Sequence, residues 1–281
     1  MNLPTLLRQK RTIIMGIINS TPDSFSDGGD YYNNTDKTLN RIKNMLTQGA
    51  DIIDIGGEST RPGSELINSD EELRRVLPLI TAMRQALGEE IIISIDTWKH
   101  TVAQEALRAG ATMINSLGGL QLDHKLADVV AHYHCPIVIY HIKGEPKTMQ
   151  QGEITYTDVM QAIADFFTEQ LRLGEKAGIT RKNFILDPGI GFGKTVEQNL
   201  EVIKRLKELQ QFDLPVLIGV SRKSHLAMIL QEELGEEILP KDRLEASLAE
   251  TAIAIQNGAQ IVRTHDVWET KKFVTVLEKF L

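Results

Sequence analysis

Only one cysteine is present in the sequence, Cys135 among 281 residues. A single thiol cannot form a disulfide within the chain, and it cannot build a metal site from several thiolates. Long apolar runs are absent as well: none approaches the roughly 18 residues of a membrane-spanning helix, and residues 1–11 lack the apolar core of a signal peptide. The sequence therefore predicts a soluble cytoplasmic protein without membrane partners.

An excess of basic residues is lacking too. The formal net charge is −7 and the pI is near 5.6, which argues against a general binder of nucleic acid or of anionic membranes. A local basic pocket is compatible with this charge. The hydrophobic fraction of 42% is enough for a sizeable core. A globular enzyme without nucleic-acid partners fits these values best.

The sequence does contain a regular alternation of short apolar runs and longer amphipathic stretches. Eight runs rich in Ile and Val predict parallel strands that are buried on both faces. They are residues 13–18, 52–55, 91–95, 113–115, 137–140, 184–186, 216–219 and 260–263. Helical patterns separate them at 39–46, 71–87, 102–109, 159–177, 200–209 and 244–255. This alternation predicts an α/β fold.

Three turns from a helix into a strand share one sequence pattern. Gly49-Ala50, Gly110-Ala111 and Gly258-Ala259 each place glycine where a helix commonly ends on a left-handed residue. The repeat favours a (β/α)8 TIM barrel, with an open doubly wound sheet as the alternative. Because barrels of this kind often use about 250 residues, and no low-complexity linker divides the chain, we expect residues 1–281 to form a single domain.

The segment from Phe184 to Lys194 is the most informative part of the chain. An apolar run ends on Asp187, and Gly189, Gly191 and Gly193 follow at alternate positions. Glycine permits positive φ and close backbone approach, so the loop is predicted to be shaped around a ligand beside a carboxylate. Its spacing fits neither a phosphate-binding P-loop nor a dinucleotide fingerprint.

Polar residues follow nearly every predicted strand. In a barrel the carboxyl ends of the strands meet on one face, where active sites form. The residues in question are Asn19, Glu58 to Arg61, Asp96, Asn115, His141, Asp187, Ser221 to Lys223, Arg263 and His265. Each one alone has a structural explanation as a helix cap. Their recurrence after eight runs predicts an active site at this end of the barrel.

The residue types indicate the chemistry of that site. Acceptors on Asp96, Asn115 and Asp187 suit a flat heterocycle that carries N–H and carbonyl groups. Positive charge after the last two strands suits a phosphate or pyrophosphate group. His265 is compatible with a phosphate contact, a general acid or simple packing. The amide oxygen of Asn19, together with oxygens of the substrate, suits Mg²⁺.

Two predicted loops after the first two strands have the composition of active-site lids. Residues 19–29 and 56–63 mix glycine, proline and small polar residues. Phe25 stands out because it is an aromatic residue in a polar segment. Ordinary surface turns are the alternative explanation for both segments.

Taken together, the motifs resemble the dihydropteroate synthase family of pterin-binding barrels. The matching segments are MGIINSTPDSFSDGG from Met15, GADIIDIGGESTRPG from Gly49, ISIDTWK from Ile93, GEPKTMQ from Gly144, LDPGIGFGK from Leu186, GVSRKS from Gly219 and RTHDV from Arg263. They cover nearly the whole chain. Each catalytic motif falls on a strand end that the residue pattern had already selected.

The resemblance implies a transferase with Mg²⁺ as cofactor. It would condense 6-hydroxymethyl-7,8-dihydropterin pyrophosphate with p-aminobenzoate to give 7,8-dihydropteroate and pyrophosphate, by an SN1-like displacement. The implied catalytic residues are Asp96, Asp187, Lys223, Arg263 and His265. Members of the family are typically homodimers and targets of sulfonamides.

The resemblance also implies which residues contact each substrate. Asp96, Asn115, Asp187 and Lys223 would surround the pterin, and Phe192 is expected to contact substrate. Asn19, Arg263, Thr264 and His265 would contact the pyrophosphate, with Asn19 near Mg²⁺. Phe25, Thr60, Arg61, Pro62 and Ser224 would serve the closing loops and the p-aminobenzoate pocket.

Two positions depart from the family pattern. Ser116 stands where the family usually has Asp, and Ile142 stands where many members have Met. The first change removes a charge and is expected to weaken support of the neighbouring strand-end groups. The second is a mild apolar exchange that we expect to be tolerated.

Three other functions are compatible with parts of the sequence. A methyltetrahydrofolate:corrinoid methyltransferase would share the carboxylates and the amide, but it would not need Arg263 and His265. A Schiff-base aldolase would use Lys223 as its nucleophile, although Arg222 beside it suggests an ion-pairing role instead. A noncatalytic paralogue that binds pterin has only Ser116 in its favour.

Overall fold

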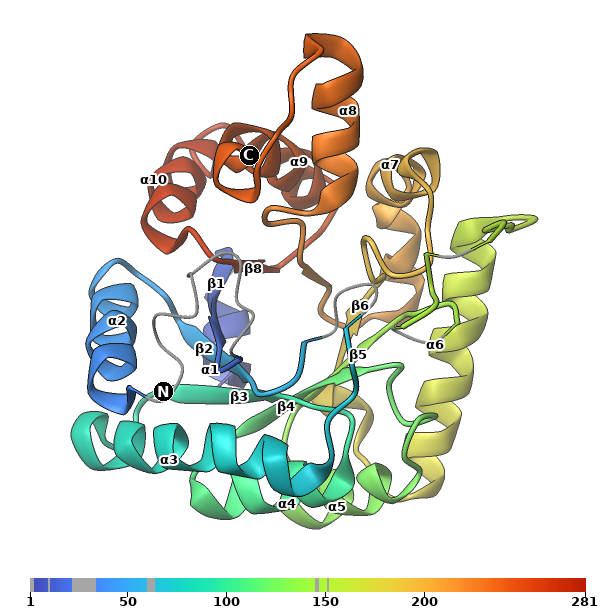
Figure 1. Ribbon diagram of the computed structural model, residues 1–281. Coiled ribbons are helices and arrows are strands. Elements are labelled where there is room, and N and C mark those ends of the chain that lie inside the picture. The colour runs from blue at the N-terminus through green and yellow to red at the C-terminus, as the bar shows by residue number, and fades with distance from the viewer. Residues whose placement is uncertain (1–2, 10, 22–33, 60–63, 145–146, 151) are drawn as a thin grey trace.

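The chain forms a closed eight-stranded parallel barrel with helices around it (Figure 1). The computed structural model describes residues 3–9, 11–21, 34–59, 64–144, 147–150 and 152–281. The strands are β1 (Ile13–Asn19), β2 (Ile52–Gly56), β3 (Ile92–Asp96), β4 (Met113–Leu117), β5 (Ile137–Tyr140), β6 (Phe184–Asp187), β7 (Leu217–Ile218) and β8 (Ile261–Thr264). All eight predicted strands are thereby confirmed, with small shifts of their ends.

Strand order shows how the barrel closes. Hydrogen-bonded neighbours run β6-β5-β4-β3-β2-β1-β8-β7, and every pair is parallel. A bridge between Leu186 and Val216 joins the two ends, and the Leu186 N–H donates to the Pro215 carbonyl at 2.9 Å. The predicted (β/α)8 barrel is confirmed, and the open sheet is wrong.

The helices alternate with the strands. They are α1 (Leu3–Arg8), α2 (Thr35–Thr47), α3 (Ser69–Leu87), α4 (His100–Ala109), α5 (Lys125–Tyr133), α6 (Val159–Lys176), α7 (Val196–Lys204), α8 (Ser224–Leu234), α9 (Leu244–Gln256) and α10 (Val267–Leu277). The predicted helix at 200–209 is partly wrong, because α7 ends at Lys204 and a 3₁₀ helix, Leu206–Phe212, follows. The pattern search missed α1, α5, α8 and α10.

The three glycine turns have the predicted backbone conformation. Gly49, Gly110 and Gly258 have φ values of 104°, 117° and 103°. At Gly110 the backbone N–H bonds to the last turn of α4, and the Ala111 N–H bonds to Ala106 O at 2.8 Å. Each glycine therefore ends its helix and directs the chain into the next strand.

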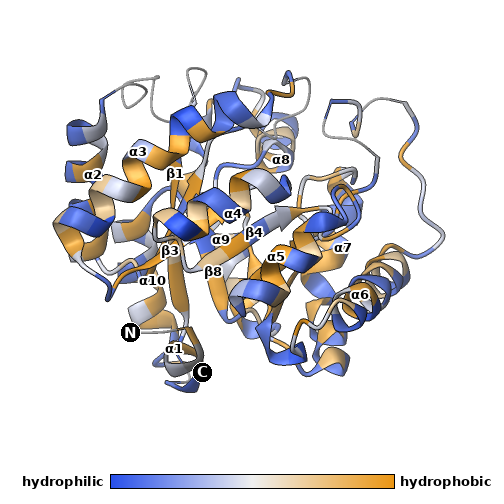
Figure 2. Ribbon diagram, turned by 90° about the horizontal axis from the view of Figure 1, so that it is seen from below, coloured by the Kyte–Doolittle hydropathy of each residue, from blue (hydrophilic) through white to orange (hydrophobic). Residues whose placement is uncertain are grey.

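Alternate strand residues fill the barrel interior, and their polarity changes along the barrel axis. The half near the amino ends is apolar: Ile13, Met15, Ile52, Ile92, Met113, Val138, Ile185, Leu217 and Ile261 form one cluster, which Leu3 and Leu6 of α1 cap. Figure 2 shows α1 below the barrel. Two residues further along, the same faces carry Asp54, Asn115, Asp187 and Arg263, and Asp96 lies four residues beyond Ile92. The barrel interior is therefore apolar near the amino ends of the strands and polar near their carboxyl ends, which form the polar mouth of the barrel.

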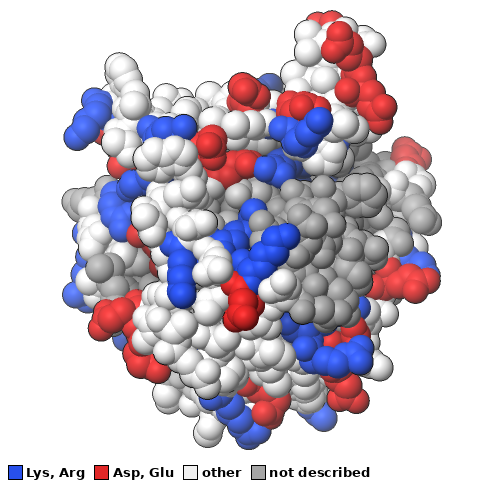
Figure 3. Space-filling view, turned by 60° about the vertical axis from the view of Figure 1, so that its left-hand side comes forward, with Lys and Arg blue, Asp and Glu red and all other residues white. Residues whose placement is uncertain are grey.

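Charged side chains of both signs are mixed on the face shown in Figure 3. Acidic residues gather on the projecting end of α8 and the turn after it, where Glu232, Glu233, Glu236 and Glu237 are exposed. Within the described helices, none is both long enough and apolar enough to cross a membrane.

The packing of α6 on β6 makes a testable prediction about Gly174. A Cβ atom added there would lie 2.2 Å from Cζ of Phe184, so alanine would overlap the ring. Alanine normally stabilises a helix by about 1 kcal/mol relative to glycine, but overpacking costs about 1–3 kcal/mol. We expect Gly174→Ala to lower the free energy of unfolding, measured by urea denaturation.

The matched control is Gly174→Ala in a Phe184→Leu background. Removing the ring removes the overlap, so there the added methyl group is expected to be neutral or stabilising. An increase in stability from Gly174→Ala in the unmodified chain would contradict the packing described for α6.

Candidate functional site

The polar mouth of the barrel brings together side chains from six strands or strand ends. Asp54 lies in β2, Asp96 ends β3, Asn115 lies in β4, Asp187 ends β6 and Arg263 lies in β8. Lys223 follows β7 and precedes α8. The sequence-based prediction that polar strand-end residues converge at this mouth is met by the contacts described below.

Arg263 is the centre of this cluster. Its Nε donates to Oδ2 of Asp54 at 2.7 Å, and its second terminal nitrogen donates to Oδ2 of Asp96 at 2.8 Å. Burial favours the neutral guanidine, but the two carboxylates outweigh burial and raise the pKa of Arg263. The arginine is therefore a fixed cation that connects β8 to β2 and β3.

Asp96 lies in an environment that favours its neutral form. Burial raises its pKa to about 7; Arg263 acts in the opposite direction, and Asp54 adds to the rise. The hydroxyl of Tyr140, at the end of β5, donates to Oδ1 of Asp96 at 3.2 Å. Perturbed carboxyl groups of this kind are typical of functional sites.

Asp187 is held by the glycine-rich loop that follows it. The Gly189 N–H donates to Oδ1 of Asp187 at 2.7 Å. Burial raises the pKa of Asp187 to about 6, and the bond from Gly189 and the charge of Lys223 oppose this rise. The loop that follows Asp187 therefore fixes the direction of its carboxylate.

Lys194, at the end of the same loop, connects the loop to the end of β5 through hydrogen bonds. Its Nζ bonds to Nδ1 of His141 at 2.9 Å, to the Gly189 carbonyl at 2.9 Å and to the Phe192 carbonyl at 3.3 Å. Burial lowers the pKa of Lys194 to about 7. In its charged form the ammonium only donates, so Nδ1 of His141 then accepts. Lys194 therefore shapes the loop that carries Phe192.

Gly189 makes the close approach that the loop sequence predicted. Its φ is +70°, and an added Cβ would lie 1.8 Å from the His141 carbonyl oxygen. No larger residue fits between the end of β5 and this loop without moving backbone. The glycine therefore sets the distance between the two strand ends.

Lys223 lies over the ring of Phe192, with Nζ 4.1 Å from the ring centroid. Burial, followed by the charge of Arg263, lowers the pKa of Lys223 to about 8. Arg222 before it has a φ of 58° and pairs with Asp266, with Nε 3.0 Å from Oδ2. This anchored turn presents Lys223 on the side of the barrel mouth where Asp187 lies.

The remaining predicted residues that the structure describes surround this cluster. His265 bonds through Nδ1 to the Ser221 hydroxyl at 3.0 Å. The Thr264 hydroxyl accepts from the Asp266 N–H at 3.1 Å and contacts Thr270, so it faces the start of α10. Ser224 is exposed as the first residue of α8, and Asn19 is half-buried as the last residue of β1. Phe25, Thr60, Arg61 and Pro62 lie outside the described residues.

Ser116 points away from the barrel mouth. Its neighbours Asn115 and Leu117 face the interior, whereas the Ser116 hydroxyl donates to the Gly119 carbonyl at 2.7 Å, in the turn after β4. Its side chain is fully buried there. The expectation that Ser116 weakens the strand-end groups has no support in its contacts, because its hydroxyl bonds to the turn after its own strand.

Sequence reasoning missed Asp54. Its side chain is fully buried, and it accepts from both Arg263 and Asn115. The signal was present, since an aspartate in the apolar run 52–55 requires a buried partner. The run was interpreted as strand only because both of its partners come from strands far away in the sequence.

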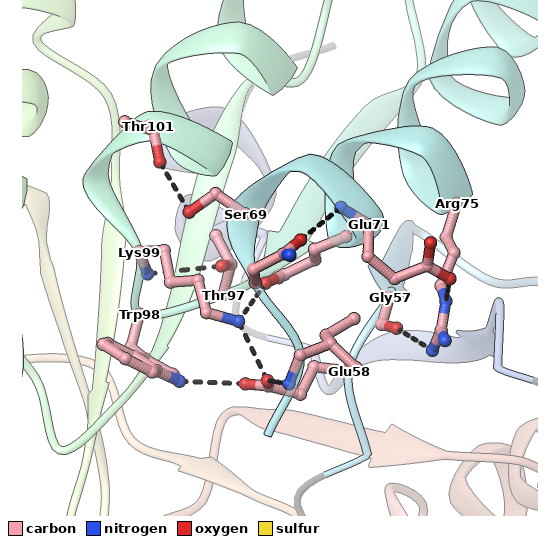
Figure 4. A network of polar contacts seen from close by, with 12 residues as sticks. Gly57, Glu58, Ser69, Glu71, Arg75, Thr97, Trp98, Lys99 and Thr101 are labelled. Atoms are coloured by element: carbon pink, nitrogen blue, oxygen red, sulfur yellow. Dashed lines mark hydrogen bonds and ion pairs between the residues drawn. The ribbon is translucent and has the colours of Figure 1, made fainter. Parts of the chain in front are cut away.

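A second missed network supports the ends of β2 and β3 (Figure 4). Lys99 Nζ contacts Glu58 Oε1 at 2.9 Å and Glu72 Oε2 at 2.6 Å. The other oxygen of Glu58 accepts from the Trp98 indole at 3.0 Å. Trp98 and Phe192 each pack against the cluster that contains Tyr140. This buried network of charged side chains therefore stabilises the ends of β2 and β3 at the barrel mouth.

A metal site made only of protein side chains is absent from the described residues, where no three His, Cys, Asp or Glu side chains are grouped suitably. An amide oxygen is available, however. A Cβ added to Gly56 would lie 3.8 Å from both Asn19 Oδ1 and Asp96 Oδ2, so both oxygens lie near the end of β2, although Asp96 Oδ2 already accepts from Arg263. Such a set suits an ion that takes most of its ligands from substrate and water, as Mg²⁺ does.

Comparisons with known proteins agree with this geometry. Residues 15–265 match the model of the family described as pterin binding enzyme. Dihydropteroate synthase from Synechocystis is 45% identical over 258 residues, covering 92% of this chain and 86% of that protein.

Solved structures give the same result. The dihydropteroate synthase of Yersinia pestis, in complex with a sulfonamide drug, superposes with a TM-score of 0.90 at 41% identity, covering 96% of this chain and 94% of that one. That of Clostridium difficile, determined in the presence of pteroic acid, has a TM-score of 0.85 at 46% identity, covering 96% and 97%. The chain therefore belongs to the dihydropteroate synthase family of pterin-binding enzymes.

Proposed function

We propose that this transferase condenses 6-hydroxymethyl-7,8-dihydropterin pyrophosphate with p-aminobenzoate, giving 7,8-dihydropteroate and pyrophosphate. The observation that carries the proposal is the arrangement at the barrel mouth, where buried acceptors, Lys223 and Arg263 meet. A flat heterocycle with several N–H groups and an anionic substituent needs this combination.

The pterin ring is assigned to the pocket between Asp96, Asn115, Asp187 and Lys223. The three acceptors are buried or half-buried, so unpaired N–H groups of a ligand would find partners that water cannot easily reach. Phe192 offers a flat surface beneath Lys223.

The pyrophosphate is assigned to Arg263, His265, the Thr264 region and Asn19. Arg263 remains charged at all relevant pH values, and its position is fixed by Asp54 and Asp96. When bound, Mg²⁺ would neutralise part of the leaving-group charge, with Asn19 as its protein ligand. A hydrogen bond with the Ser221 hydroxyl holds the His265 side chain, which we assign to the pyrophosphate site.

The reaction needs little acid–base chemistry from the protein. The bond between the pterin methylene carbon and the pyrophosphate oxygen breaks, and the amine nitrogen of p-aminobenzoate forms the new bond and then releases one proton to the departing pyrophosphate or to solvent. Arg263 stabilises the departing anion, and the carboxylates of Asp96 and Asp187 stabilise the cationic pterin methylene. The aromatic amine is neutral at pH 7, so positioning is the main requirement.

The p-aminobenzoate contacts remain predictions from the sequence. They are Phe25, Pro62 and Ser224, and the resemblance assigns Thr60 and Arg61 to the second closing loop; of these five only Ser224 lies among the described residues. Exposed Ser224 follows Lys223 at the start of α8, so an amine substrate there would lie next to the proposed pterin site.

We also infer a single domain over residues 1–281, because all eight strands build one barrel. The cytoplasmic location likewise stays a prediction.

We further propose that the protein is a homodimer through the apolar face of α9 and α10. Val276 and Phe280 are 60% and 83% exposed, and Ile253 of α9 is 44% exposed. Val276 and Phe280, together with Leu248 of α9, line a groove of about 550 Å³ whose walls are mainly apolar side chains. A face of this kind is typical of a surface that a second copy covers.

The first test replaces Lys223 with Ala and Asp187 with Asn. Each change removes one charged partner of the proposed pterin site, so we expect each to abolish dihydropteroate formation while thermal stability is kept. Mass spectrometry of the product, with both substrates and Mg²⁺, measures this. Near-normal turnover in either variant would contradict the assignment of the pterin site. Pterin pyrophosphate binding without product in the unmodified protein would instead favour a noncatalytic paralogue.

A second prediction concerns pH. Asp187, with a pKa of about 6, and Asp96, with a pKa of about 7, become charged as pH rises, whereas Lys223 loses its charge above about pH 8. We therefore expect kcat/KM for the pterin substrate to be highest between about pH 7 and 8 and to fall on both sides.

Lys223→Arg is the control for the alkaline side of this profile. Arginine keeps its charge, so any activity that survives should no longer fall above about pH 8. A flat profile for the unmodified enzyme from pH 5 to 9 would contradict the proposed charge requirement.

The dimer is tested by placing charge on the apolar face. Val276→Glu and Phe280→Glu are expected to convert a dimer into monomers, because each would bury an unpaired carboxylate in the interface. Light scattering after size-exclusion chromatography measures the mass. Leu122→Glu, at an exposed residue in the turn after β4, is the matched control and should leave the mass unchanged. A monomeric unmodified protein would refute the proposal.

A further inference from the structure

Asp54 is the most deeply buried ionisable group at the barrel mouth. Its side chain has no solvent exposure, and one oxygen, Oδ2, accepts both Arg263 Nε at 2.7 Å and Asn115 Nδ2 at 3.0 Å. A guanidinium always carries its protons, so Oδ2 acts as an acceptor. Asp54 therefore connects a cation of β8 with an amide of β4.

This contact determines which way the Asn115 amide points. If the amide were reversed, its oxygen would face Oδ2 of Asp54, and two acceptors would be in contact without a proton between them. Only the NH₂ group can face Asp54. The Asn115 oxygen must therefore face elsewhere.

The Asn115 oxygen is buried and has no hydrogen-bond partner among the described side chains and backbone. The residue is only 2% exposed. A buried acceptor without a partner costs stability and is therefore rare in folded proteins. Oδ1 of Asp54 also lacks a partner among the described residues, but its side chain has no exposure, whereas Asn115 lies at the barrel mouth, where a ligand can supply the missing donor.

We propose that Asp54 is a positioning residue that sets substrate specificity: it holds the Asn115 amide so that its oxygen accepts one N–H of the heterocycle. The inference rests on the proposed pterin site and adds a specificity device to it. A ligand without a donor at that point would leave the Asn115 oxygen unpaired, which typically weakens binding about 10- to 100-fold.

Comparing Asp54→Asn with Asp54→Leu distinguishes the orienting role of Asp54 from its role in neutralising the charge of Arg263. Asp54→Asn keeps an oxygen that can accept from both Arg263 and Asn115, so the Asn115 amide should keep its direction. Asp54→Leu fills similar space but removes the acceptor, so the amide can turn. A purely electrostatic role would make both variants equally defective.

The experiment measures the affinity of 6-hydroxymethylpterin by calorimetry. This probe lacks pyrophosphate, so a loss of phosphate contacts to Arg263 does not change the measured affinity. We expect Asp54→Asn to bind within about threefold of the unmodified protein, and Asp54→Leu and Asn115→Ala each to lose about 10-fold or more. The Asp54→Leu/Asn115→Ala double variant should be no weaker than Asn115→Ala.

Three results would overturn the inference: tight binding by Asp54→Leu, equal losses in Asp54→Asn and Asp54→Leu, or losses that multiply in the double variant. If Asp54→Leu does not fold, Asn115→Asp provides the test without changing Asp54. It keeps an acceptor for the ligand but places a second carboxylate against Asp54, so a loss of about 10-fold or more is expected. Unchanged binding would contradict the role.

Failure of the proposed function gives a different result. If the unmodified protein binds no pterin, the site assignment itself is wrong. If it binds pterin and Asp54→Leu binds equally well, only the role of Asp54 is wrong.

Discussion

The buried guanidinium of Arg263 is the interaction on which the barrel mouth depends. It takes one acceptor from β2 and one from β3, so three strands are connected by a single cation. Without it, Asp54 and Asp96 would place two negative charges in a region of low polarity, which is costly. The polar mouth is possible because these charges compensate one another.

The same compensation leaves the site poised for binding. Asp96 and Asp187 have raised pKa values, and Lys223 has a lowered one, mainly because all three are buried. Charges that are only partly compensated within the protein gain most from a ligand that completes their contacts. The glycine loop and Lys194 keep this arrangement in place before any ligand arrives.

The sequence was sufficient to predict the strands and much of the site, because a strand buried on both faces leaves a clear apolar run and its polar end stands out. Asp96, Asp187 and Lys223 were found in this way. Asp54 and Lys194 were not, because their partners are distant in sequence: Arg263 lies 209 residues from Asp54, and His141 lies 53 residues from Lys194. Length does not explain why α5, with nine residues, and α10, with 11, were missed, because α7 with nine residues was predicted in part.

A crystal structure of the protein with 6-hydroxymethylpterin and pyrophosphate would test the central claim most directly. The account predicts a pterin ring against Phe192, with donors facing Asp96, Asn115 and Asp187, and pyrophosphate at Arg263 and His265. A pterin bound outside the barrel mouth, or a ring that makes no hydrogen bond to these three acceptors, would contradict it.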